Sequence, residues 1–149
     1  MRIQTKFFGD VELYLDQRWT FPKGIPGFED EKEFALLPIE NNSTFQVLQS
    51  TTDRDIALIV ANPYLLVENY SFDIDEPTIE LLTIKEAEDI FVLAVLTLKD
   101  PFETSTINLQ APVIFQSKSK TAKQMLINDT AFSIRHTIGT QDTAIQGEA

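Results

Sequence analysis

The segment DIFVLAVLTL, residues 89–98, is the most apolar stretch of the chain. Its length is that of a core strand, and it is far too short to span a bilayer. Asp100-Pro101 ends it, because proline has no amide hydrogen to offer a strand ladder. We therefore expect the central strand of the fold here, with its partners on either side in the sequence.

Short strand candidates flank this segment in both directions. Ile3, Thr5 and Phe7 alternate with polar residues, and Gly9-Asp10 is a turn signal before a return strand. The candidates in chain order are 2–7, 11–15, 34–39, 45–50, 56–62, 70–74, 79–84, 104–109 and 111–116. Many short strands at regular spacing predict an all-β, mostly antiparallel sandwich or barrel-like domain with at most one or two short helical turns.

Three other segments are less regular. KTAKQMLI (120–127) fits a helical face and a strand alternation equally well, and EDEKEF (29–34) fits a single helical turn. The end of the chain, 139–149, lacks bulky apolar residues apart from Ile145. We therefore expect a single domain over residues 1–138 and a flexible tail after it.

The composition limits the classes of function. The chain has 149 residues, no cysteine, and 23 acidic against 12 basic residues, for a net charge of −11. The lack of cysteine excludes disulfides and thiolate zinc sites, and the lack of an apolar N-terminal run predicts a cytoplasmic protein without a membrane anchor. Such a charge repels nucleic acid and attracts a basic partner, although it also serves solubility alone.

The charge is distributed unevenly. Residues 68–89 hold eight acidic residues against Lys85, whereas residues 118–135 hold four basic residues against Asp129. An acidic middle and a mildly basic end form two different surfaces if the fold separates them.

The residue inventory argues against catalysis. His136 is the only histidine and has no evident catalytic partner, so a surface or sheet-edge position is expected. Neither a nucleophile motif nor a phosphate-binding loop occurs. DIDE (73–76) resembles the start of a calcium loop but lacks its glycine and final glutamate. We predict no enzymatic activity, no metal and no cofactor.

Several segments, taken in order, carry a family resemblance. They are GIPGFED (24–30), FQVLQSTTD (45–53), VANPY (60–64), DIFVLAVLTL (89–98), TINLQAPVIF (106–115) and AKQMLI (122–127). With this order and spacing, the chain from residue 1 to about residue 136 resembles the FliW family of flagellar assembly factors.

The resemblance implies a small, non-catalytic β protein, monomeric when free. It implies binding to the translational repressor CsrA, which is thereby kept from flagellin messenger RNA. It also implies binding to flagellin, which captures the factor when it accumulates and so frees CsrA. Direct contact with nucleic acid is not expected.

Two modes of antagonism remain open. Carboxylates of 68–89 can mimic RNA phosphates on the repressor, or the protein can bind elsewhere and disfavour the RNA-binding state. The resemblance favours the second mode. The expected partner contacts are Asp73, Asp75, Glu76, Glu86, Glu88, Asp89 and Asn108. The alternative is a solvated loop and strand face, with Glu86 and Glu88 on one side of a strand and Asn108 capping a turn.

The glycine-rich stretch FPKGIPGFED (21–30) is interpreted as a rigid corner. Gly24 and Gly27 permit unusual backbone angles, Pro26 fixes one, and Phe21 and Phe28 are expected to pin both ends into the core. Two other classes of protein are compatible with the sequence. One is a ligand-binding or catalytic barrel with a deep pocket, and the other is a structural subunit that self-associates through a strand edge.

Overall fold

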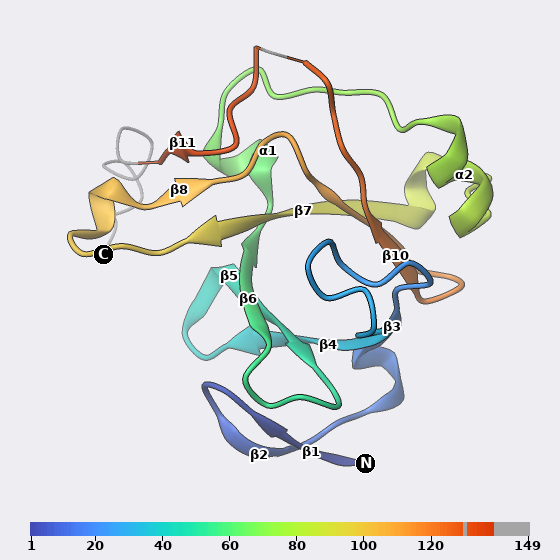
Figure 1. The fold of residues 1–149 in the computed structure, drawn as a ribbon, viewed down its shortest axis with the longest axis vertical. Coiled ribbons are helices and arrows are strands. Elements are labelled where there is room, and N and C mark those ends of the chain that lie inside the picture. Colours follow the sequence, from blue (N-terminus) through green and yellow to red (C-terminus); the bar gives the residue numbers. More distant parts are fainter. Residues whose placement is uncertain (130, 139–149) are drawn as a thin grey trace.

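The computed structural model describes residues 1–129 and 131–138 (Figure 1). Of these residues, 39% lie in strands and 15% in helices, and the large sheet curls into a barrel-like ring. This confirms the predicted all-β, mostly antiparallel fold. The tail predicted at 139–149 lies outside the described residues, and the single domain over 1–138 stays a prediction.

The elements follow one another along the chain with short connections. The strands are β1 (Arg2–Thr5), β2 (Gly9–Glu12), β3 (Arg18–Thr20), β4 (Glu33–Ile39), β5 (Asn42–Ser50), β6 (Ala57–Ala61), β7 (Ile90–Thr97), β8 (Thr106–Ile107), β9 (Val113–Gln116), β10 (Thr121–Gln124) and β11 (His136–Thr137). The helices are α1 (Pro63–Leu66) and α2 (Glu76–Leu82), with 3-10 turns η1 (Leu15–Gln17), η2 (Ala87–Asp89) and η3 (Phe102–Thr104).

The strand predicted from the apolar segment is β7, and it closes the ring. Its residues 90–93 pair with β9, while residues 94–96 pair with β6. The ring therefore runs β3-β4-β5-β6-β7-β9-β10 and returns to β3 through one parallel pair, Thr121 with Thr20. Strands β8 and β11 extend the sheet beyond β7.

An aromatic cluster fills the inside of this ring. Phe21, Phe34 and Phe115 are fully buried. The ring of Phe91 stacks on that of Phe115 with centroids 4.8 Å apart, and Trp19 meets both edge-on. Because these residues come from β3, β4, β7 and β9 and from the loop after β3, their burial holds the two sides of the ring together.

A hairpin of β1 and β2 covers the outside of β4 and β5. Its Ile3 and the following Leu13 pack against Leu37 and Val47. Gln49 fastens the hairpin in place, since its buried side-chain oxygen accepts a hydrogen bond of 3.0 Å from the amide of Lys6. The return strand ends at Glu12 rather than Leu15, which lies in η1 and is exposed.

Two segments that the sequence predicts to be strands are a helix and a loop instead. IELLTI (79–84) was expected to be a strand, but Asp75 accepts a hydrogen bond of 2.9 Å from the amide of Thr78, and Pro77 lies in the first turn. Both features start helices, and in so short a segment they outweigh apolar alternation. YSFDI (70–74) has no ladder partner among the described residues and forms the loop that leads into α2.

Of the ambiguous segment 120–127, residues Thr121–Gln124 form a strand, β10. Beyond β10, the amide of Met125 donates to Pro112 at 2.8 Å and that of Ile127 to Gln110 at 2.7 Å. These bonds keep the register of the pair Gln124 and Val113, so the ladder continues on one side. It becomes irregular because proline has no amide and the amide of Gln110 donates to Asn108 instead.

Of the two aromatic residues predicted to enter the core from the corner at 21–30, only one does. Phe21 is fully buried, but Phe28 is 39% exposed, and Ile25 is the second residue that enters the core. The reason is a tight bridge between Ile25 and Phe28, which turns the Phe28 ring outward. EDEKEF (29–34) forms no helical turn, because its last two residues already pair in β4.

Gly24 is the residue on which this corner depends. Its φ is +65°, and a Cβ added there would lie 2.5 Å from the carbonyl oxygen of Glu29. We expect Gly24→Ala to lower the free energy of unfolding by about 2 kcal/mol or more, because strain and a backbone clash add. Gly27→Ala is the control: φ is also positive at +91°, but nothing lies near the added Cβ. Gly27→Ala should lower the free energy of unfolding by only about 1 kcal/mol. Equal losses in chemical denaturation would contradict the role of the clash.

Candidate functional site

Five of the predicted contact residues lie exposed at one edge of the molecule. Asp73 and Asp75 precede α2, Glu76 begins it, and Glu86 and Glu88 are in and beside η2. We call these five residues the acidic edge. Helix α2 lies beside the start of β7 (Figure 1), and η2 leads directly into that strand at Ile90, so the five residues lie along one short stretch of the chain.

Asp89 differs from the other predicted contacts. It is 8% exposed, and its Oδ1 lies 3.5 Å from Nζ of Lys118 in the connection between β9 and β10. Its backbone carbonyl also accepts a hydrogen bond from Ser117. Asp89 therefore ties η2 to that connection, and its carboxylate is largely shielded from an approaching partner.

Glu86 and Glu88 were expected to share one face of a strand, and this was wrong. Glu86 precedes the single 3-10 turn that contains Glu88, so the two side chains meet across a turn. A hydrogen bond between them, together with repulsion from Asp89, raises the pKa of Glu86. The negative charge here is crowded, and a cation from a partner would relieve that repulsion.

Asp75 has a structural role as well as a charge. It is the N-cap of α2, and hydrogen bonding from Thr78 lowers the pKa of its carboxyl group, with help from the positive charge of Lys123. Asp75 is therefore ionised at neutral pH while it holds the start of the helix in place.

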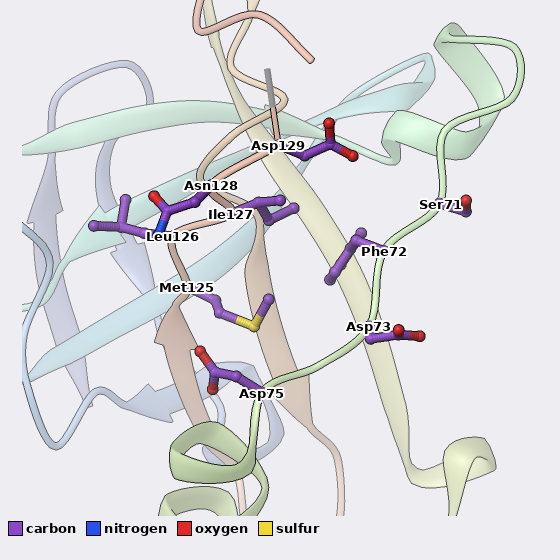
Figure 2. A pocket seen from close by; sticks show the side chains of 9 residues that line it. All are labelled: Ser71, Phe72, Asp73, Asp75, Met125, Leu126, Ile127, Asn128 and Asp129. Atoms are coloured by element: carbon purple, nitrogen blue, oxygen red, sulfur yellow. The ribbon is translucent and has the colours of Figure 1, made fainter. Parts of the chain in front are cut away.

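A groove runs beside the acidic edge (Figure 2). Its volume is about 470 Å³, and it lies between the loop 71–75 and the chain segment 125–129. Figure 2 shows Phe72, Met125 and Ile127 pointing toward one another across it. Carboxylates also line it, from Asp73, Asp75 and Asp129. The groove thus combines an apolar floor with negative charge.

Asn108 lies apart from the acidic edge and caps a turn. Its Oδ1 accepts a hydrogen bond of 3.0 Å from the amide of Gln110, and the residue is half-buried. The neighbouring Leu109 carbonyl accepts a 2.7 Å hydrogen bond from the Tyr70 hydroxyl, and burial raises the pKa of Tyr70. Of its two expected roles, the structure shows turn capping; contact with a partner stays a prediction.

A second surface was missed in the sequence. An apolar cleft of about 430 Å³ lies between the β1–β2 turn and the outer face of the sheet. Its lining residues are Phe7, Phe8, Ile39, Val47, Ile59 and Leu98. Phe7 is 51% and Leu98 47% exposed. The pair Phe7-Phe8 beside a glycine turn is the available signal in the sequence, but the alternation with polar residues predicts Phe7 on the apolar face of the first strand.

Other kinds of site receive no support from the described residues. Within residues 1–129 and 131–138, no three His, Cys, Asp or Glu side chains are grouped so as to hold a metal ion. In the same part of the chain, no helix has the length and apolar character needed to cross a membrane. His136 is half-buried on β11, the outermost strand of the sheet.

The fold and these two surfaces define a class: a small β protein with a filled core, whose distinctive features, an acidic edge and an apolar cleft, lie on its outside. The model of the FliW protein family matches residues 2–138. Flagellar assembly factor FliW of Bacillus velezensis is 44% identical over 139 residues, and that of Bacillus subtilis 43%, each match covering 93% of this chain and 97% of the relative.

A solved structure agrees with these relatives. The crystal structure of the flagellar assembly factor FliW superposes with a TM-score of 0.87 at 33% identity, covering 93% of this chain and 96% of that one. The chain therefore belongs to the FliW family of flagellar assembly factors, which is a non-enzymatic family. This confirms both the resemblance in the sequence and the prediction that the protein is not an enzyme.

The cap formed by Asp75 gives a pH-dependent prediction. Because the folded state lowers its pKa below the ordinary 3.8, the cap contributes stability above that pH and loses it as the pH falls further. Asp75→Ala should lower the free energy of unfolding by about 1 kcal/mol at neutral pH. The difference from the parent protein should shrink at about pH 3.

Asp75→Asn is the matched control, since asparagine also caps helices and should cost much less than alanine. Urea unfolding of the three proteins at both pH values is the measurement. A loss for Asp75→Ala that does not change with pH would contradict the ionised cap.

Proposed function

We propose that this flagellar assembly factor acts in the cytoplasm by binding two proteins in competition, the translational repressor CsrA and flagellin. Bound to the factor, CsrA is kept from flagellin messenger RNA. Flagellin that accumulates captures the factor, and the released CsrA then represses further flagellin synthesis. Membership of the FliW family at about 43% identity supports this function, and the two surfaces on the molecule suit two different partners.

The observation that carries the proposal is the acidic edge. Asp73, Glu76 and Glu88 are exposed and come from three successive local structures, the loop, the helix and the 3-10 turn. No ion pair within the described residues neutralises them. An RNA-binding repressor is basic, and complementary charge speeds and orients its encounter with such an edge. Of the two modes of antagonism, we propose that the protein disfavours the RNA-binding state of CsrA from a separate contact.

Reversing the charge of the acidic edge tests its role. The triple variant Asp73→Lys, Glu76→Lys and Glu88→Lys should bind purified CsrA at least about tenfold more weakly, because attraction becomes repulsion. Affinity of the parent protein should fall as salt rises. Isothermal titration at low and high salt measures both effects.

A control with the same change in net charge uses exposed acids elsewhere: Asp10→Lys, Glu40→Lys and Glu103→Lys. It should bind CsrA much more tightly than the first variant. Equal affinities for the two variants would show that only net charge matters, and a parent protein that binds neither CsrA nor flagellin would refute the proposed function.

The apolar cleft is the surface we propose for flagellin. Its lining carries no charge, and flagellin's terminal segments are amphipathic, so an apolar helix face can dock there as a helix does in a groove. Its residues Phe7 and Leu98 are far more exposed than core residues, which is the pattern of an interaction surface.

Polar substitution in this cleft should separate the two partners. Phe7→Ser and Leu98→Ser together should weaken flagellin binding at least about tenfold and leave CsrA binding within about twofold, because the cleft is distinct from the acidic edge. Leu15→Ser, at a residue 78% exposed in η1, is the control and should bind both partners like the parent. Unchanged flagellin affinity in the double variant would remove the cleft from the proposal.

A further inference from the structure

The chain after β10 offers an unpaired strand edge. The amides of Met125 and Ile127 donate to Pro112 and Gln110, so in an extended chain the amides of Leu126 and Asn128 face the opposite side. On that side β3 pairs with β10 only at Thr121. Among the described residues, no acceptor receives a hydrogen bond from the amide of Leu126 or Asn128.

This edge is open and lacks the usual protection. Leu126 is 68% exposed, Asn128 is also exposed, and neither is charged. Figure 2 shows the side chains of Leu126 and Met125 leaving the segment in opposite directions, as they do in a strand. Natural proteins commonly block an edge with lysine, proline or a bulge, because free backbone groups pair with another chain. An exposed edge of this kind favours addition of a strand from a partner.

The charges beside the edge indicate which strand fits. Asp73, Asp75 and Asp129 line the adjoining groove, and the positive charge that acts on Asp75 is that of the half-buried Lys123. An added strand points alternate side chains to opposite faces. One row would lie beside these carboxylates and the apolar side chains of Phe72 and Ile127. Lysine or arginine residues alternating with apolar ones complement that surface.

We propose that residues 124–128 are a docking edge onto which an extended, basic segment of the repressor adds as a β-strand. Hydrogen bonds to the backbone of Leu126 and Asn128 supply affinity, and the carboxylates of the groove select the basic partner. The inference rests on the proposed function and adds the mode of contact to it. It differs from contact through the acidic side chains alone, because it requires free backbone groups at fixed positions.

A proline at the edge tests this requirement. Leu126→Pro removes an amide that faces the free edge, while the two amides that bond to β9's side of the ladder belong to its neighbours and remain. It should weaken CsrA binding at least about tenfold, measured by titration. Leu126→Ala removes the side chain but keeps the amide, so it should weaken CsrA binding by less than about threefold. Equal affinities for these two variants would overturn the inference.

Hydrogen exchange on the unaltered protein keeps the test independent of how well the proline variant folds. The amides of Leu126 and Asn128 should exchange fast in the free protein and more slowly when purified CsrA is bound. If CsrA binds and these amides exchange as before, the docking edge is wrong while the proposed function stands. If CsrA does not bind at all, the proposed function fails and the inference with it.

Two further outcomes identify a different occupant and overturn the assignment. Protection of the same amides by flagellin instead of CsrA would make the edge a flagellin surface. Protection that rises with the concentration of this protein alone would make it a contact between two copies.

Discussion

The structure depends on the way β7 divides its hydrogen bonds between β6 on one edge and β8 and β9 on the other. Residues 90–93 pair with β9 on one edge, and residues 94–96 pair with β6 on the other. Because the strand is shared in this way, the sheet that begins at β3 returns to β3 as a ring. The aromatic rings of Phe91 and Phe115 stack at this junction, so burial of apolar surface and the backbone ladder reinforce each other.

The cost of this arrangement is a register shift beside β7. Leu96 faces Ile107 and Leu93 faces Val113, so three residues of β7 correspond to six residues of the chain beside it. The additional residues lie between Asn108 and Pro112, where this part of the chain leaves the ladder with β7. There Oδ1 of Asn108 accepts a hydrogen bond from the amide of Gln110, and the Tyr70 hydroxyl donates one to the carbonyl of Leu109. The carbonyls of Gln110 and Pro112 then accept from Ile127 and Met125, and this extends β10 on one side only. The groove and the free edge both exist because the chain leaves the ladder with β7 at this point.

The sequence predicted much of the fold because most strands carry a strong local signal. The segments 34–39, 45–50, 56–62 and 89–98 became β4, β5, β6 and β7 within a few residues. It failed at IELLTI (79–84), where a cap and a proline in a short segment decided for helix, and it missed β3, which pairs through three residues only. The candidate acids were found from composition, yet composition did not distinguish exposed Glu88 from shielded Asp89.

The sequence alone determined the class of fold, the family and the excess of acid in residues 68–89, because periodicity, motif order and charge are properties of consecutive residues. Only the tertiary structure decided what those residues present to a partner. The apolar cleft joins Phe7, Ile39 and Leu98 across most of the chain, and the free edge at Leu126 exists because Asn108 and Pro112 alter a ladder made with another segment. Such surfaces depend on which distant segments pair, and the alternation within one strand does not identify the segment that will pair with it.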